Sequence, residues 1–341
     1  MRFVKCILIK YSKLMKNLIT GFGNQLRHAL EIGANTILQE NKKEIRNVMI
    51  TGLGGSGIGG TIVSELVAKE CIVPISTNKG YNLPNYINEN TLVICSSFSG
   101  NTEETLEAFE IAKANSAEIA CVTSGGKLLE WAKENNLNYI QLPSAESPRT
   151  MMGYSITQLL YFLNHYGLIS DTFKVELNKA ATLIDDFQEE IQAGAERISD
   201  HLEGKTPVIY SCDGYGGMAV RFRQQLNENA KMLCWHHVLP EMNHNELVGW
   251  RNKDENLAVI FFRNDTDYIR NQKRLEINKE VISNYTSSVM EFWSKGSSMI
   301  EKTFYLINVG DHVSYILSKK NGVIAEEIEV INKLKGALAD F

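Results

Sequence analysis

Twice along this chain, a short apolar run leads through a glycine-rich turn into a helical pattern. Val48–Ile50 precedes the glycines of residues 52–60, and Val208–Tyr210 precedes a second turn at Asp213–Gly217. Around both turns, apolar runs of strand length alternate with segments of helical periodicity, a pattern typical of a parallel sheet covered by helices on both faces. We therefore predict an α/β fold with two doubly wound parallel-sheet halves and flanking helices.

The expected elements follow from this alternation. In the first half we expect strands at 47–51, 72–77, 91–96, 118–123 and 138–142, and helices at 18–44, 61–69, 103–115 and 128–135. In the second half we expect strands at 207–211, 257–262 and 287–293, helices at 218–229 and 270–284, a loop at 238–239 and a largely helical remainder. The predicted domains are 17–150, a helical connector at 151–204, and 205–341 with a helical tail.

The composition excludes several classes of protein. A chain of 341 residues is long enough for two domains. A net charge of −5 argues against a nucleic-acid-binding protein, which needs a basic face. No window approaches the roughly 20 apolar residues of a membrane span. Lys5 interrupts the apolar run Phe3–Ile9, so we expect Met1–Lys16 to be a short extension rather than a signal peptide, and the protein to be cytoplasmic.

The cysteines and histidines do not suggest a metal site. The six cysteines are scattered without a CxxC pair, and several lie in apolar runs, which favours buried apolar side chains in a reducing compartment. His236 and His237 are neighbours on an extended segment and would point to opposite faces. We therefore expect neither a metal nor another cofactor.

The first glycine-rich turn, Thr51–Gly60, is typical of a phosphate-binding site. Its Gly52-x-Gly54-x-x-Gly57 spacing matches the dinucleotide fingerprint, in which backbone N–H groups at a helix start approach an anion. A dinucleotide site also needs an acidic residue after the second strand to hold the ribose. Asn78 and Lys79 stand there instead. The turn thus predicts a phosphorylated ligand and weakens the nicotinamide alternative.

The second turn, Ser96–Thr105, follows an apolar strand and opens a helix. Ser97, Ser99 and Thr102 can present three hydroxyls beside exposed backbone donors, which favours a phosphate monoester. The alternative is that these residues only cap the helix, but capping needs one such side chain.

Together these turns resemble the phosphosugar-binding signature of sugar-isomerase (SIS) domains. The matching segments are Gly54-Gly-Ser56 and Ser97-Phe-Ser-Gly-Asn-Thr102, and Ser124-Gly-Gly126 fits more loosely. The resemblance implies that a sugar phosphate is bound there. The residues implied are Gly54, Gly55, Ser56, Ser97, Ser99 and Thr102.

Three later segments are similar to those of bifunctional phosphoglucose/phosphomannose isomerases. They are Ser147–Ser155, Gln225–Lys231 and Pro240–Trp250. Aldose–ketose isomerisation needs a base, a ring-opening group and positive charge beside an enediolate. The resemblance implies that Glu228 is the base, that His244 opens the ring from across a dimer interface, and that Arg149 stabilises negative charge. Composition leaves Glu241 and Glu246 as competing carboxylates.

The tail Val330–Gly336 completes the resemblance, which covers the chain from Asn47 onward. Lys335 resembles a lysine that these isomerases place against the sugar. The alternative is that this lysine, at the end of a helix, does no more than complement the helix dipole. The family carries a threonine shortly before this lysine, and the stretch Ala325–Val330 has none.

The expected function is interconversion of glucose 6-phosphate, and also mannose 6-phosphate, with fructose 6-phosphate through a cis-enediolate. We expect a homodimer with shared active sites and no nucleic-acid or membrane partner. The alternatives are a non-catalytic SIS protein that senses a sugar phosphate and a nicotinamide-dependent oxidoreductase. An SIS-type amidotransferase fits less well, because we recognise no domain with an N-terminal cysteine nucleophile ahead of the fold.

Overall fold

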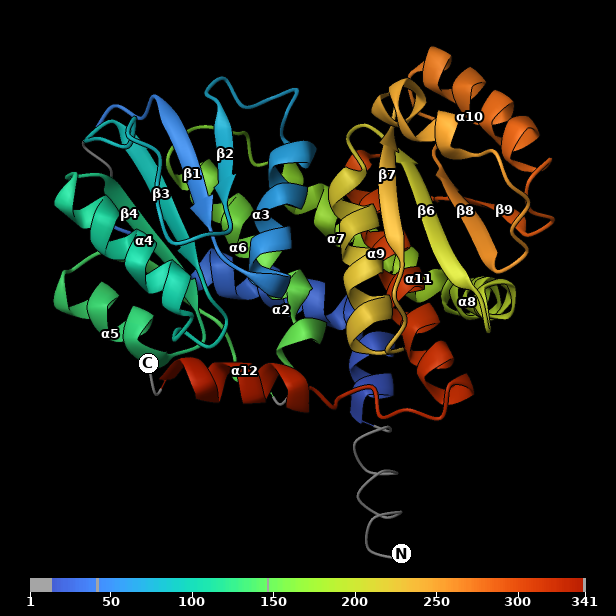
Figure 1. Cartoon of the computed structure of the whole chain (residues 1–341). Helices are drawn as coiled ribbons and strands as arrows, with labels where there is room; N and C mark the ends of the chain where they lie inside the picture. The colour runs from blue at the N-terminus through green and yellow to red at the C-terminus, as the bar shows by residue number, and fades with distance from the viewer. Residues whose placement is uncertain (1–13, 41–42, 146, 340–341) are drawn as a thin grey trace, which may run out of the picture. The chain divides into compact units, whose positions relative to one another are not determined.

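The computed structural model of the chain describes residues 14–40, 43–145 and 147–339. They form two compact units, each built on its own sheet (Figure 1). The N-terminal unit comprises Gly21–Asp186 and Lys295–Phe304, and the C-terminal unit comprises described residues 14–20, 187–294 and 305–339. The helical segment 151–204, which we expected as a separate connector, is divided between the units after Asp186.

The N-terminal unit contains a five-stranded sheet with the order β2-β1-β3-β4-β5, parallel throughout. Its strands are β1 Asn47–Thr51, β2 Ile75–Asn78, β3 Thr91–Ser96, β4 Glu118–Thr123 and β5 Asn138–Gln141. Thr51 pairs with Asn78 on one side and with Cys95 on the other. The carboxyl ends of these three strands therefore lie at one edge, where ligands bind in open parallel sheets.

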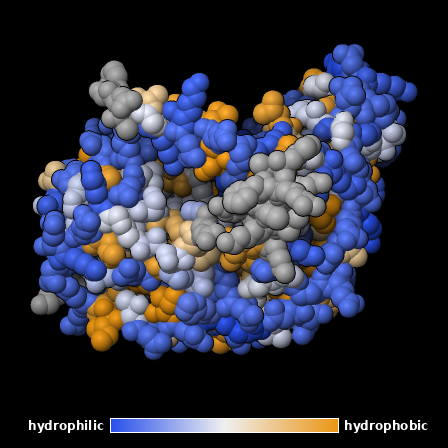
Figure 2. Space-filling view, turned by 90° about the horizontal axis from the view of Figure 1, so that it is seen from below, coloured by the Kyte–Doolittle hydropathy of each residue, from blue (hydrophilic) through white to orange (hydrophobic). Residues whose placement is uncertain are grey.

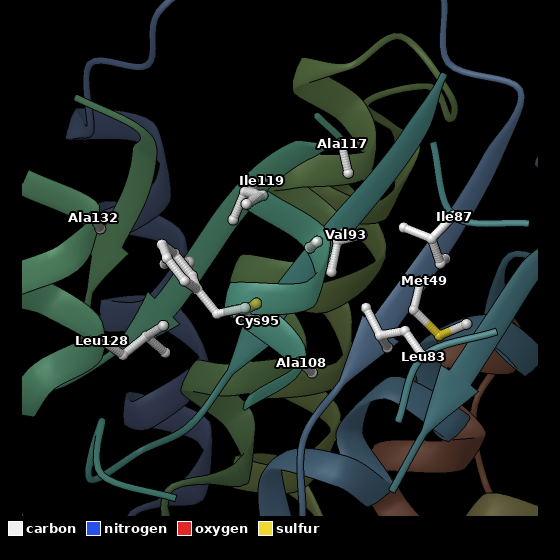
Figure 3. Close-up of a cluster of buried hydrophobic side chains, with 13 residues drawn as sticks. Met49, Leu83, Ile87, Val93, Cys95, Ala108, Ala117, Ile119, Leu128 and Ala132 are labelled. Carbon is white, nitrogen blue, oxygen red and sulfur yellow. The ribbon is translucent and has the colours of Figure 1, made fainter. Parts of the chain in front are cut away.

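Helices cover both faces of this sheet. They are α2 Phe22–Asn35, α3 Gly54–Leu66, α4 Glu103–Ala114, α5 Gly126–Glu134, α6 Met152–His165 and α7 Thr172–Asp186. Val93 and Cys95 of β3 belong to the buried cluster that α4 and α5 complete (Figure 3). On the opposite face, Ile50 of β1 packs against Gly60 of α3. Because both faces are covered, the central strands β1, β3 and β4 are buried along almost their whole length, whereas the edge strands β2 and β5 are more exposed.

The C-terminal unit repeats this arrangement with the strand order β7-β6-β8-β9, again parallel throughout. Its strands are β6 Thr206–Cys212, β7 Trp235–Leu239, β8 Leu257–Arg263 and β9 Val289–Trp293. With β6 in the place of β1, the order is that of β2-β1-β3-β4. The predicted duplication of architecture is therefore confirmed.

The remaining helices include the tail of the chain. They are α8 Gln188–Leu202, α9 Gly216–Glu228, α10 Ile269–Ile282, α11 Met299–Lys320 and α12 Glu329–Ala339. Residues 14–20 are also helical, and Met15 and Ile19 are buried in a cluster with Ala325. Residues 1–13 of the expected extension lie outside the described residues. Met15, by contrast, is part of the core of the C-terminal unit, so the extension predicted over 1–16 is too long.

Several local expectations are wrong. The helix expected over 18–44 ends at Asn35, and the strand expected from residue 72 begins at Ile75. Residues 235–239 form strand β7, where we expected a loop from Val238; this strand lies at the edge of its sheet and is only partly apolar. Helix α3 begins at Gly54 rather than at Thr61. Its glycines permit a close approach: a Cβ at Gly57 would lie 2.3 Å from the carbonyl oxygen of Gly52. Tight packing against the preceding turn overrides the poor helix propensity of glycine.

The surface is mixed in character. The face seen in Figure 2 is largely hydrophilic, with separate hydrophobic patches. Among the described residues, no helix has both the length and the apolar run needed to cross a membrane.

Of the described cysteines, Cys95, Cys121 and Cys212 are buried and Cys71 and Cys234 are partly buried, and all five are free thiols, in line with their expected role as small apolar residues.

Candidate active site

Three loops meet at the carboxyl edge of the first sheet. One joins β1 to α3, the second joins β3 to α4 over residues 97–102, and the third joins β4 to α5 at residues 124–125. The strands that precede them are neighbours in register, because Thr51 pairs with Cys95 and Ser96 pairs with Val122. The glycine-rich and serine-rich turns of the sequence are thus adjacent in space.

Hydroxyl groups link the first two loops and shape the second. Ser97 Oγ lies 2.8 Å from Thr102 Oγ1 and accepts a hydrogen bond from the backbone N–H of Gly100 at 3.1 Å. Across the loops, the N–H of Phe98 donates to Ser56 Oγ at 3.2 Å. Ser56 and Ser97 are buried. Both hydroxyls are therefore fixed in place before any ligand arrives.

The third loop completes the arrangement. Ser124 donates to the carbonyl oxygen of Phe98 from its N–H at 3.0 Å and from its hydroxyl at 2.6 Å. The N–H of Lys127 donates to Asn101 Oδ1 at 3.0 Å. This loop matches the SIS signature only loosely, and the sequence alone does not show that Asn101 bridges two loops. We call the three segments the hydroxyl cradle; they are Gly54–Ser56, Ser97–Thr102 and Ser124–Gly126.

Gly100 is the position where the cradle depends most on glycine. Its φ is +70°, in the left-handed region, and a Cβ there would lie 1.7 Å from the carbonyl oxygen of Gly125. The second and third loops can approach each other this closely only because residue 100 has no side chain.

The cradle can hold a small anion. Helices α3 and α4 both begin in it, and the residues at their N-caps, Leu53 and Thr102, make no side-chain capping bond. Thr102 thus does not serve as a helix cap, and the N–H groups at both helix starts add partial positive charge to the cradle. A Cβ at Gly54 or Gly55 would meet no described atom within 4 Å, so ligand atoms have room there.

The end of β2 lacks the group that a dinucleotide needs. Asn78 is its last residue, and its side-chain N–H donates to the carbonyl oxygen of Gly80 at 2.7 Å. The next residue, Lys79, donates to Thr61 Oγ1 at 2.9 Å. An amide and an amine therefore occupy the position where a carboxylate would hold the ribose.

Arg149 also belongs to the N-terminal unit. It lies in the 3-10 turn η1 Pro148–Thr150, which contacts helix α3 of the cradle. The buried side chain of Gln25 braces this turn by donating to the carbonyl oxygen of Thr150 at 2.8 Å and accepting from the N–H of Gly153 at 2.8 Å. The half-buried Arg149 side chain is therefore carried on a braced turn that contacts α3.

Glu228, in the C-terminal unit, is the last residue of α9. It lines a pocket of about 350 Å³, a volume within the range of small-ligand sites. The rest of the lining is Asn227, Lys231, Met232, Leu233, Glu327, Ile328, Val330 and Ile331. The pocket thus lies between the end of α9 and the start of α12.

Neither Lys335 nor His244 lines this pocket. Lys335 is exposed on α12, one helical turn beyond Ile331 on the same stripe of the helix. His244 is exposed at the end of the 3-10 turn η2 Glu241–His244 and does not line the pocket. Its turn is anchored by buried Met242 and by a 2.7 Å hydrogen bond from Asn243 to Asn278.

The two competing carboxylates have other partners. Glu246 Oε1 accepts a hydrogen bond from the hydroxyl of Tyr210 and another from Trp235 Nε1 at 3.1 Å. Burial, and next the bond to Glu246, raise the pKa of Tyr210, so this phenol stays a donor. Glu241 accepts from the Asn245 amide at 2.8 Å and is exposed. Neither carboxylate lines the pocket of Glu228.

Solved structures share this fold. One is the C-terminal domain of glucosamine-fructose-6-phosphate aminotransferase from Francisella tularensis, with a TM-score of 0.74 at 14% identity, covering 90% of this chain and 96% of that chain. Another is tagatose-6-phosphate ketose/aldose isomerase from Escherichia coli, with a TM-score of 0.68 at 16% identity, covering 93% of this chain and 94% of that chain. The fold defines a double-SIS α/β protein with the hydroxyl cradle at the edge of its first sheet.

The sequence comparisons identify the family. The model for the bacterial phospho-glucose isomerase C-terminal SIS domain matches residues 191–338. A bifunctional phosphoglucose/phosphomannose isomerase from Caldicellulosiruptor bescii is 36% identical, over 93% of this chain and 96% of that protein. One from Thermoplasma acidophilum is 33% identical, over 85% and 88%. The chain belongs to the bifunctional phosphoglucose/phosphomannose isomerase family, and the predicted resemblance and SIS fold are confirmed.

Proposed function

We propose that this protein interconverts glucose 6-phosphate and mannose 6-phosphate with fructose 6-phosphate. The observation that carries the proposal is the hydroxyl cradle, whose loops are held by their own hydrogen bonds around two uncapped helix starts. Family membership supports the reaction, since the relatives above are named for both isomerase activities.

In this proposal the cradle binds the substrate phosphate. Ser97, Ser99 and Thr102 donate their hydroxyls, and Gly54–Ser56 donate backbone N–H groups from the start of α3. Fixing the phosphate orients the sugar and removes much of the entropic barrier to proton transfer. Arg149 stabilises the negative charge that develops on the substrate oxygens.

Glu228 is the proposed base, and His244 is the proposed ring-opening group. His244 transfers a proton between O1 and O5 as the pyranose opens. Glu228 then removes the C2 proton of the aldose, which leaves a planar cis-enediolate, and returns a proton to C1 to give the ketose. Rotation about C2–C3 before C2 is reprotonated would give the epimeric aldose. In this proposal Lys335 contacts the sugar.

The assembly and setting are also proposals. We propose a homodimer with shared active sites, in which His244 acts across the interface, in a cytoplasmic protein of carbohydrate metabolism that serves glycolysis and gluconeogenesis. Sedimentation analysis of the wild type and of a one-to-one mixture of Glu228→Gln and His244→Ala tests the shared site. If each site draws on both chains, the mixture should regain about a quarter of wild-type turnover, because about half of its dimers are hybrids and one of the two sites in each hybrid has both wild-type residues.

Solvent deuterium incorporation tests the reaction and its base together. Wild type in D₂O should place deuterium at C2 of glucose 6-phosphate, and Glu228→Gln should lose about 10²–10⁴ in kcat with little change in KM. Glu241→Gln is the matched control and should retain turnover. Binding of the sugar phosphate without turnover would instead support a sensor, and undiminished exchange by Glu228→Gln would remove Glu228 as the base.

A further inference from the structure

The last turn of α9 is held in place by residues far away in the sequence. Asn229 Nδ2 donates to Ser314 Oγ at 3.0 Å, and Asn321 Nδ2 donates to the carbonyl oxygen of Ala230 at 2.9 Å. Both partners lie on or just after α11. Helix ends leave backbone carbonyls without intrahelical partners and tend to fray, so such bonds determine where the terminal side chains point.

Lys231 makes the most extensive of these connections. Its Nζ donates to the carbonyl oxygen of Glu228, to that of Ala325 at 3.3 Å and to that of Glu327 at 2.7 Å. An ammonium group at a helix C-terminus also interacts favourably with the helix dipole. One side chain thus joins the end of α9 to the segment that leads into α12.

The backbone of Lys231 is itself unusual. Its φ is +57°, in the left-handed region, which a non-glycine residue adopts only where its surroundings determine it. This conformation turns the chain back, so that the N–H of Met232 donates to the carbonyl oxygen of Leu226 at 3.1 Å. The side chain can then reach both Glu228 and the tail.

The tail segment is firmly anchored at the other end. Ala325 is 2% exposed and lies in a cluster with Met15 and Ile19, against which Tyr315 packs. A hydrogen bond to its carbonyl therefore ties α9 to a buried point. The Glu327 carbonyl lies two residues before α12, in the wall of the pocket that Glu228 lines.

We infer that Lys231 is a positioning residue, which holds the Glu228 carboxylate and the tail wall of the pocket in one fixed arrangement. The inference rests on the proposed function, since it gives Glu228 a catalytic task. Lys231 does not act on the substrate in this account. Its contribution passes through Glu228, whose misplacement by about 1 Å can reduce turnover by roughly 100-fold.

Three substitutions at this position separate the side-chain donors from the backbone. Lys231→Met keeps the length of the stem but removes the donors. Lys231→Asn tolerates the left-handed conformation but is too short to reach the tail. Lys231→Arg restores N–H donors. The methionine and asparagine variants should both lose about 10- to 100-fold in kcat with KM changed less than about twofold, and the arginine variant should recover most of the loss.

The chain offers a matched control. α3 and α9 follow the equivalent strands β1 and β6, and each is a 13-residue helix. Lys69 stands three residues after the end of α3, as Lys231 does after α9, and is exposed. Lys69→Met should leave kcat and KM unchanged within experimental error.

Two further measurements decide whether Lys231 acts through Glu228. The double variant Lys231→Met/Glu228→Gln should be no slower than Glu228→Gln alone by more than about twofold, because a misplaced base and an absent base fail in the same step. Hydrogen–deuterium exchange should be at least about tenfold faster in Lys231→Met over peptides covering 225–232 and 324–330, and unchanged in Lys69→Met.

These readouts distinguish failure of the inference from failure of the proposed function. If the wild type does not interconvert the hexose phosphates, the proposed function fails. Independently of that result, unchanged hydrogen–deuterium exchange in Lys231→Met would refute the positioning role of Lys231. If the wild type is active, a Lys231→Met enzyme with kcat within twofold of wild type would overturn the inference. Losses that add to those of Glu228→Gln would overturn it as well.

Discussion

Removing the carboxylate of Asp311 should destabilise the C-terminal unit strongly. Arg221 Nη2 lies 3.0 Å from Asp311 Oδ1 and 3.4 Å from Oδ2, and Gln225 Nε2 donates to Oδ1 at 2.6 Å. The two charged side chains are 2% and 5% exposed. Asp311→Ala would take this carboxylate away from a guanidinium that water cannot reach. Breaking such a buried pair costs about 3–5 kcal/mol.

The expected change is large enough for a simple assay. With a urea dependence of about 3 kcal/mol per molar, a loss of 3–5 kcal/mol lowers the unfolding midpoint by roughly 1–1.7 M. The unfolding should be followed by circular dichroism and by tryptophan fluorescence. The control is Glu44→Ala, which removes the carboxylate of the Glu44–Arg46 pair. That pair has a similar distance of 2.9 Å but side chains 69% and 64% exposed, so its loss should leave the unfolding midpoint unchanged within experimental error.

The pKa of Asp311 sharpens the prediction. Burial raises this pKa, and the Arg221 guanidinium offsets only part of the rise. A raised pKa means that the native state holds the Asp311 proton more tightly than the unfolded state does. The stability that this protonation contributes is therefore lost as the pH rises through the native-state pKa. At neutral pH the charged pair therefore adds little net stability. The double variant Arg221→Met/Asp311→Leu should recover to within about 1–2 kcal/mol of wild type. A loss below 1 kcal/mol for Asp311→Ala, or a double variant as unstable as the single, would refute this reasoning.

Three further predictions address the cradle, pH and metals. Gly100→Ala should lower the free energy of unfolding in urea by more than about 2 kcal/mol and weaken sugar-phosphate binding. The control is Gly167→Ala, which should cost only about 1–2 kcal/mol, because Gly167 has φ +71° but no described atom lies within 4 Å of the added Cβ. Burial lowers the pKa of His312 to about 4, so the native state binds fewer protons than the unfolded state and stability falls as the pH drops from 6.5 to 4. Urea titrations at pH 6.5 and pH 4 should show that His312→Gln reduces this loss of unfolding free energy by on the order of 3 kcal/mol. An unchanged loss would contradict the lowered pKa of His312. Isomerisation should survive prolonged EDTA treatment, and activity restored only by a divalent ion would mean that the reaction class is wrong.

Much of the fold was predictable because its signals are local. The apolar runs that became β1, β3, β4, β6 and β8 were placed within about a residue of their observed bounds. The exceptions have physical causes. Residues 235–239 carry two histidines and form an edge strand, and the first turns of α3 consist largely of glycine, so neither segment has the composition typical of its structure.

The candidate site also has some features that the sequence predicts and others that it does not. The hydroxyls of Ser97 and Thr102 could be placed together from the sequence, because the two residues lie five positions apart in one turn. The brace from Gln25 to the turn of Arg149 could not, because the contact joins residues 125 positions apart. The role of Asn101 between two loops escaped prediction for the same reason.

The sequence by itself determined that this chain forms two wound parallel sheets and that hydroxyls and helix starts gather at the edge of the first. Strand and helix periodicity, and the order of strands that follows from short connections, depend on residues close together in the chain. Only the tertiary structure showed the surroundings of the carboxylates: Glu246 accepts a hydrogen bond from Tyr210, 36 positions away, whereas Glu228 lines a pocket with the tail. It also showed that Lys231 ties that helix end to Ala325, 94 positions away. Such contacts depend on how the buried elements pack, which no local pattern of residues encodes.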